Sequence, residues 1–156
     1  MAEANKGCLE ELALQASSCD TIAQKLNKAN FEEYFTNVLQ DFRRFNSQAG
    51  NPGFTFSDDS YTDSEKETLI EGYSKFVDET KPYLKTLAEK LSTEVPDGKG
   101  YLAQILRDES QNFDGNTQKI KAAIFLLTGS DWEKRIYEKS NELQRFIHAI
   151  VHNFSP

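Results

Sequence analysis

Two histidines near the end of the chain are the side chains best placed to bind a metal ion. His148 and His152 are the only histidines and lie four residues apart, so on a helix both imidazoles would face one side. The spacing matches the outer histidines of the zincin motif, but Ala149 stands where that motif has its glutamate. We therefore expect no metal site, and a metal-dependent enzyme using these two histidines remains an alternative.

The two cysteines, Cys8 and Cys19, lie in one segment with helical spacing of its apolar residues. On a continuous helix their Cα atoms would be about 16 Å apart, whereas a disulfide allows roughly 7 Å at most. We expect two free thiols, as in a reducing compartment. Oxidised cysteines would instead require a break in the helix and would indicate a secreted protein.

Adjacent acidic residues do not form a catalytic pair. They are Glu10–Glu11, Glu32–Glu33, Asp58–Asp59 and Asp108–Glu109. Neighbouring side chains on a helix point about 100° apart and do not converge on one substrate atom. The segment 110–115 resembles the first half of a calcium loop, but Lys121 stands where a bidentate glutamate is needed. Nucleotide-binding and hydrolase motifs are also missing from the sequence, so we expect neither enzyme activity nor a cofactor.

An aromatic loop, expected over residues 47–61, is the best candidate for a binding site. Its candidate binding residues are Phe54, Phe56, Asp58, Asp59 and Tyr61. The aromatic side chains either close one end of a helical bundle or stand exposed as anchors for another protein. In the second case the neighbouring aspartates would suit a basic protein partner.

The composition describes an acidic chain with the size of one domain. The 156 residues include 18 Lys and Arg against 25 Asp and Glu, a net charge of −7. Nonspecific binding to nucleic acid or anionic lipid requires surplus cations, so we exclude both as the main function. No apolar run approaches the ~20 residues of a membrane span. We expect a soluble cytoplasmic protein, or a secreted or cell-surface protein if a signal peptide has been removed.

Apolar residues recur at helical spacing along almost the whole chain and predict an all-α fold. We expect a single-domain antiparallel bundle of about five to six helices, with residues 1–7 disordered. Three helices should be long, at 8–28, 63–92 and 131–154, and the second of these should begin with a Thr62–Glu65 capping box and kink at Pro82. A helix that begins at Phe31 should stop before the loop, and two short helices should flank a polar break at 110–116. Small residues in the seam of the first helix should let a neighbouring helix approach closely.

These features favour a non-catalytic protein-interaction module of adaptor, effector or inhibitor type, which uses an acidic helical surface and the aromatic loop. One alternative is an immunity protein that neutralises a basic toxin by charge complementarity. Another is a secreted or surface-exposed helical antigen. A carrier of a small ligand would need a cavity among the many phenylalanines, and neither that cavity nor the oligomeric state can be derived from the sequence.

Overall fold

The helical spacing of the apolar residues is realised as five long α-helices in the structure, a computed structural model that describes residues 1–57 and 60–152. The helices are α1 (Ala2–Ala23), α2 (Phe31–Gly50), α3 (Asp63–Thr93), α4 (Gly100–Thr128) and α5 (Glu133–His152), with a 3-10 turn at Ser130–Trp132. The described ranges contain no strand, which confirms the predicted all-α class. Within these ranges no helix is both long and apolar enough to cross a membrane.

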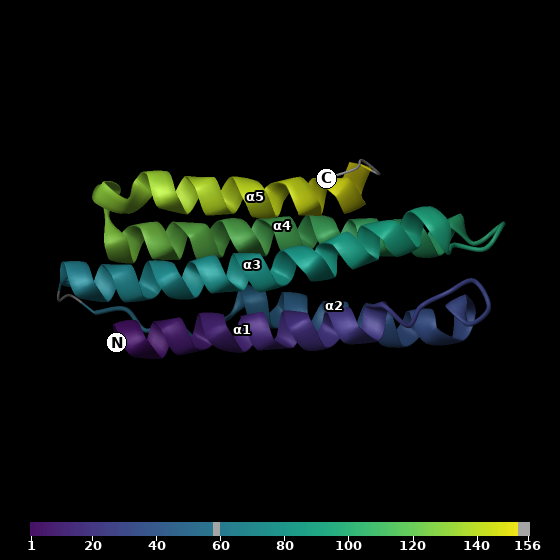
Figure 1. Cartoon of the computed structure of the whole chain (residues 1–156), viewed down its shortest axis with the longest axis horizontal. Helices are drawn as coiled ribbons and strands as arrows, with labels where there is room; N and C mark the ends of the chain where they lie inside the picture. Colours follow the sequence, from purple (N-terminus) through teal and green to yellow (C-terminus); the bar gives the residue numbers. More distant parts are fainter. Residues whose placement is uncertain (58–59, 153–156) are drawn as a thin grey trace.

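Consecutive helices run in opposite directions and share one hydrophobic core. In Figure 1, α1, α3 and α5 point one way and α2 and α4 point the other, which confirms the antiparallel bundle. α2 ends near the middle of the bundle, and the chain continues from there to the end where α3 begins (Figure 1). Because α2 has 20 residues and α3 has 31, their lengths are about 30 and 46 Å. Residues 51–57 and 60–62 must therefore cover the part of the core that α2 does not reach.

The interface between α1 and α3 depends on small residues, as the seam of the first helix predicts. Ala13, Ala16 and Ala23 of α1 are buried. On α3, a Cβ atom added to Gly72 would lie 2.9 Å from Cγ and 3.3 Å from Cα of Lys6. Glycine at position 72 thus lets the two backbones approach closely.

Aromatic rings fill the centre of the bundle. The side chains that are less than 2% exposed include Phe31, Phe42, Phe45, Tyr73, Phe76, Tyr83 and Phe113. The ring centroid of Phe113 lies 5.3 Å from that of Phe45 and 5.8 Å from that of Phe42. These distances are typical of favourable aromatic pairs, so the rings pack against one another in the interior.

The predicted start and course of α3 are confirmed. The Thr62 hydroxyl accepts a hydrogen bond from the Glu65 amide, and the Glu65 carboxylate accepts one from the Thr62 amide. The helix continues through Pro82 in one register and bends along its length (Figure 1). Proline lacks the amide hydrogen that would bond to the preceding turn, so a helix with an internal proline is expected to bend.

The predicted polar break at 110–116 is wrong, because α4 is continuous from Gly100 to Thr128. Ser110 and Thr117 lie on the buried stripe, where their hydroxyls donate to the backbone oxygens of Leu106 and Asp114. Asn116 donates to the Oδ1 atom of Asn46 on α2 at 2.6 Å. The polar residues of this segment therefore satisfy hydrogen bonds inside a helical interface rather than ending the helix.

Two other expected boundaries are also wrong. Residues 1–7 are not disordered, since α1 begins at Ala2 and both Ala2 and Asn5 are buried. The loop expected over 47–61 is shorter, because α2 continues to Gly50. All five α-helices have 20 residues or more, so three is too small a number of long helices.

A cluster of ion pairs joins α3 to α5. Lys81 donates to Glu142 at 2.8 Å, and Lys139 lies 2.9 Å from Asp78 and 3.5 Å from Glu142. The hydrogen bond from Lys81 lowers the pKa of Glu142, and the hydrogen bond to Glu142 raises the pKa of Lys81. Both shifts mean that the charged forms are favoured in the folded chain.

The Glu142→Gln variant should be less stable than the wild type by about 0.5–1 kcal/mol at neutral pH and low salt. A carboxyl whose pKa is lowered on folding stabilises the chain above its unfolded pKa and loses that effect as the pH falls through its folded pKa. The difference between wild type and variant should therefore shrink below about pH 4. Urea denaturation of wild type and variant at several pH values measures this difference in stability. A difference that grows toward low pH would contradict a lowered pKa of Glu142 in the folded chain.

Candidate functional site

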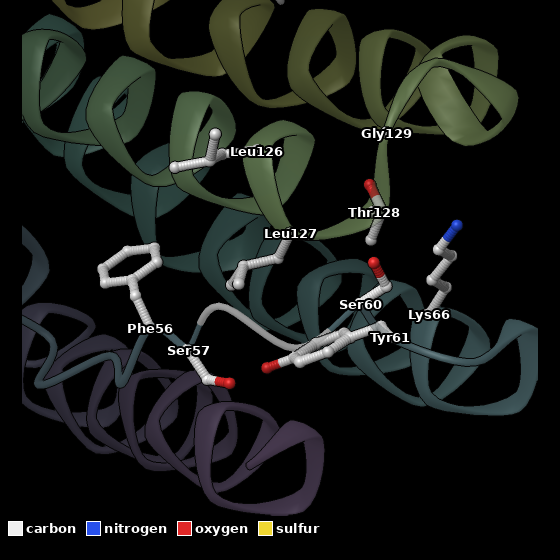
Figure 2. A pocket seen from close by; sticks show the side chains of 9 residues that line it. All are labelled: Phe56, Ser57, Ser60, Tyr61, Lys66, Leu126, Leu127, Thr128 and Gly129. Carbon is white, nitrogen blue, oxygen red and sulfur yellow. The ribbon is translucent and has the colours of Figure 1, made fainter.

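A surface groove follows from the way the segment formed by residues 51–57 and 60–62 completes the bundle. The segment crosses between α1 and the second half of α4, in line with α2 (Figures 1 and 2). An extended chain is narrower than a helix, which measures about 10–12 Å across with its side chains. Replacing a helix with an extended segment therefore leaves hollows beside α4.

The segment is held in place by α1. The Asn5 side chain, which is 0% exposed, donates to the Thr55 carbonyl oxygen and the Tyr61 hydroxyl, each at 2.9 Å. Its Oδ1 atom accepts from the Thr55 amide at 2.8 Å. One turn further along α1, the Cys8 thiol lies 3.7 Å from the carbonyl oxygen of Gly53. The backbone at position 53 has a φ of +84°, a conformation that favours glycine over other residues. Asn5 thus attaches the segment to α1 at two places, Thr55 and Tyr61.

The larger hollow has a volume of about 390 Å³. It is lined by Phe56, Ser57, Ser60, Tyr61, Lys66, Leu126, Leu127, Thr128 and Gly129. Figure 2 shows Phe56 and Tyr61 on the side of the segment and Leu126 and Leu127 on the side of α4, with Lys66 near Thr128 at the other end. Hydroxyl groups and one ammonium group therefore surround the end of this hollow that lies away from Phe56.

A second hollow, of about 220 Å³, lies on the other side of Phe56. It is lined by Ala49, Asn51, Pro52, Gly53, Phe54, Phe56, Lys119, Ile120 and Ala123. Because Phe56 lines both hollows, they lie next to each other along α4, between Lys119 and Gly129. Ten residues of helix correspond to about 15 Å. We call the two adjacent hollows together the acyl-sized groove, with a polar end at Lys66 and an apolar end at Phe54.

The predicted aromatic residues of the loop are brought together here, each in a different environment. Phe54 is half-buried and packs against the core, whereas Phe56 is 53% exposed. Tyr61 packs on the core and accepts the hydrogen bond from Asn5. The other two predicted residues, Asp58 and Asp59, lie outside the described residues. Phe54 thus closes the bundle, and Phe56 stands as the exposed wall of the groove.

The other candidate groups do not join this site. The rings of His148 and His152 lie 5.6 Å apart, and the described part of the chain has no cluster of three potential metal ligands. Cys8 and Cys19 are free thiols, as predicted. Burial, together with the nearby Asp41 carboxylate, raises the pKa of Cys19 to about 11. Cys19 is therefore protonated at neutral pH and is a poor nucleophile.

Several residues that line the groove, support it or lie beside it are not predicted from the sequence. The sequence analysis expects Asn5 in a disordered end, although Ala2, Asn5, Leu9 and Leu12 continue the helical spacing of the buried stripe. The run Phe125–Leu126–Leu127 could have indicated an exposed apolar surface, because three consecutive apolar residues cannot all face the core side of a helix. Lys66 and Lys119 gave no signal, since lysines are common on any helix surface.

Comparison with known proteins identifies the fold. No family model and no curated protein sequence matches the chain. A search of solved structures found the crystal structure of AFMP4P in complex with palmitic acid, with a TM-score of 0.70 and 7% sequence identity. The match covers 99% of this chain and 100% of that chain. At this identity the likeness concerns the fold alone, and this chain therefore has the helical architecture of that protein.

Proposed function

We propose that this chain is a non-catalytic carrier that binds a long-chain fatty acid in the acyl-sized groove. The observation that carries the proposal is the groove itself, about 15 Å long, with hollows of about 390 and 220 Å³ on either side of Phe56. The larger hollow alone is within the range of ligand sites in proteins. The structural neighbour, whose fold this chain shares, is in complex with palmitic acid.

The residues of the groove suggest how the ligand would lie. An acyl chain would contact Ile120 and Ala123 on α4 and the ring of Phe54 across the groove. Each methylene group removed from water contributes about 0.8 kcal/mol, so the chain supplies most of the affinity. The carboxylate would lie at the polar end, where the Lys66 ammonium group and the Ser60 hydroxyl can donate hydrogen bonds. The Thr128 hydroxyl already donates to the backbone oxygen of Ile124.

The aromatic interior supports binding in the groove rather than in the bundle. Phe42, Phe45 and Phe113 are 0% exposed, with their rings in contact at the centre. A chain placed among them would have to displace close-packed rings, which costs stability. The groove requires no such rearrangement.

Titration of the purified chain with palmitate tests the proposal, and Lys66→Gln should weaken binding about tenfold because a charge-assisted hydrogen bond is lost. Lys119→Gln, at the apolar end of the same groove, is the matched control and should change the affinity by about twofold at most. Cetyl alcohol, which has the same chain without the carboxylate, should bind both variants equally. Absence of palmitate binding by the wild type would refute the proposal, and a larger effect of Lys119→Gln would reverse the orientation of the ligand.

A second candidate is a protein-interaction module anchored by the aromatic loop. The observation that favours it is the exposure of Phe56, 53%, beside Leu126, which is 74% exposed. Exposed aromatic anchors of this kind dominate many protein interfaces. Recovery of a protein partner by the wild type, lost in the Phe54→Ala/Phe56→Ala variant while palmitate binding persists, would favour this candidate.

A further inference from the structure

The exposed apolar residues of this chain are unevenly distributed. Of the large apolar side chains that are exposed, four lie around the second half of α4: Phe56, Phe125, Leu126 and Tyr137. Phe56 contributes to the acyl-sized groove on one side of α4, and Phe125 and Tyr137 line a hollow of about 230 Å³ between α4 and α5 on the other. Leu126 and Ala122 lie on α4 between the two hollows and are exposed.

The α4 part of this face differs in charge from the chain as a whole. The chain carries a net charge of −7, but residues 115–130 contain two lysines, Lys119 and Lys121, and no acidic residue. The acidic residues near this face belong to other elements, such as Glu133 and Glu138 on α5. The Lys121 ammonium group lies 5.1 Å from the centroid of the Tyr137 ring. Exposed phenylalanine, leucine and tyrosine with lysines beside them form the pattern of protein surfaces that lie in the interface of a lipid bilayer.

We propose that this face, defined by Phe56, Phe125, Leu126, Tyr137, Lys119 and Lys121, docks on an anionic lipid surface. The inference rests on the proposed function and deepens it, because the acyl-sized groove opens on the same face and the bilayer becomes the source of its ligand. The apolar side chains enter the headgroup region, and the two lysines approach anionic headgroups. A second copy of the chain fits this face poorly, since a symmetric pair would bring the lysines of both copies together.

The experiment measures flotation of the ligand-free chain with two kinds of vesicle, one of phosphatidylcholine and one that also contains phosphatidylglycerol. The test variant is Phe125→Ser/Tyr137→Ser, because neither residue lines the acyl-sized groove. Its matched control is Leu14→Ser/Tyr101→Ser. Leu14 and Tyr101 are 67% and 58% exposed, and Tyr101 also lies beside a lysine, Lys99, at 6.0 Å. Circular dichroism confirms that each variant is folded.

We expect the wild type and the control variant to float with both vesicles, more strongly with the anionic ones. The Phe125→Ser/Tyr137→Ser variant should bind vesicles at least about tenfold more weakly. Lys121→Gln should weaken binding to the anionic vesicles alone by about fivefold, and Lys25→Gln on the surface elsewhere should not.

Palmitate titration of the same variants in vesicle-free buffer separates this inference from the proposed function. Vesicle binding without palmitate binding refutes the carrier and leaves the docking face in place. Equal flotation of the test and control variants, or no flotation of the wild type, overturns the docking face whatever the palmitate result. A wild-type dimer in vesicle-free buffer that the test variant dissociates would also overturn it, in favour of self-association.

Discussion

Replacing Asn5 with leucine is expected to reduce the free energy of unfolding by about 3 kcal/mol. The leucine has nearly the same shape but leaves three groups without their partner: the Thr55 amide, the Thr55 carbonyl oxygen and the Tyr61 hydroxyl. Each buried polar group left unpaired costs about 1–3 kcal/mol, and water reaching the loop reduces that cost for some of them. Urea denaturation followed by circular dichroism measures the loss.

An exposed asparagine within a helix provides the control for Asn5. Asn112 lies on α4 and is exposed, so Asn112→Leu should change stability by about 0.5 kcal/mol or less. The Asn5→Leu variant should also be cut by proteases within residues 51–57 more quickly than the wild type, because the segment has lost its attachment to α1. Equal stability of the two variants would show that Asn5 does not hold the segment.

The sequence was sufficient for the fold class because helical spacing of apolar residues survives local irregularities. The stripe through Ile70, Tyr73, Val77 and Leu84 kept its register across Pro82, and α3 is one helix as expected. The same rule failed at 110–116, where polar residues were interpreted as a break. Ser110 and Thr117 are buried because their hydroxyls bond to backbone oxygens of their own helix, which a polar-or-apolar pattern does not represent.

Only the part of the candidate site that belongs to the aromatic loop could be predicted from the sequence. Phe54, Phe56 and Tyr61 were identified because aromatic residues are conspicuous among glycine and serine. The opposite wall of the groove belongs to α4, about 70 residues further along the chain, and a single sequence gives no sign of which helix lies there. That pairing depends on the length of α2, which is about 16 Å shorter than α3 and leaves this part of the core to the extended segment. The sequence analysis also ends α2 too early, because it expects the loop to begin at residue 47, whereas α2 continues to Gly50.

The largest loss of stability is expected for Phe113→Ala, at about 3–5 kcal/mol. Phe113 is 0% exposed, and its ring contacts those of Phe42 and Phe45 at the centre of the bundle. Truncation removes the ring and leaves an apolar cavity that the surrounding helices fill only in part. Phe125→Ala on the same helix, where the side chain is 37% exposed, is the matched control and should cost about 1 kcal/mol or less. Urea denaturation of both variants tests the difference.

The same variant distinguishes binding in the groove from binding in the interior of the bundle. Phe113 does not line the acyl-sized groove, so the palmitate affinity of folded Phe113→Ala should equal that of the wild type. If palmitate entered the interior instead, the cavity left by the ring would accept part of the chain and raise the affinity, as engineered apolar cavities accept apolar ligands. Lys66→Gln then provides the opposite test, because it alters the groove without altering the core. Weaker binding in Lys66→Gln with unchanged binding in Phe113→Ala places the ligand against α4, and stronger binding in Phe113→Ala places it among the aromatic rings.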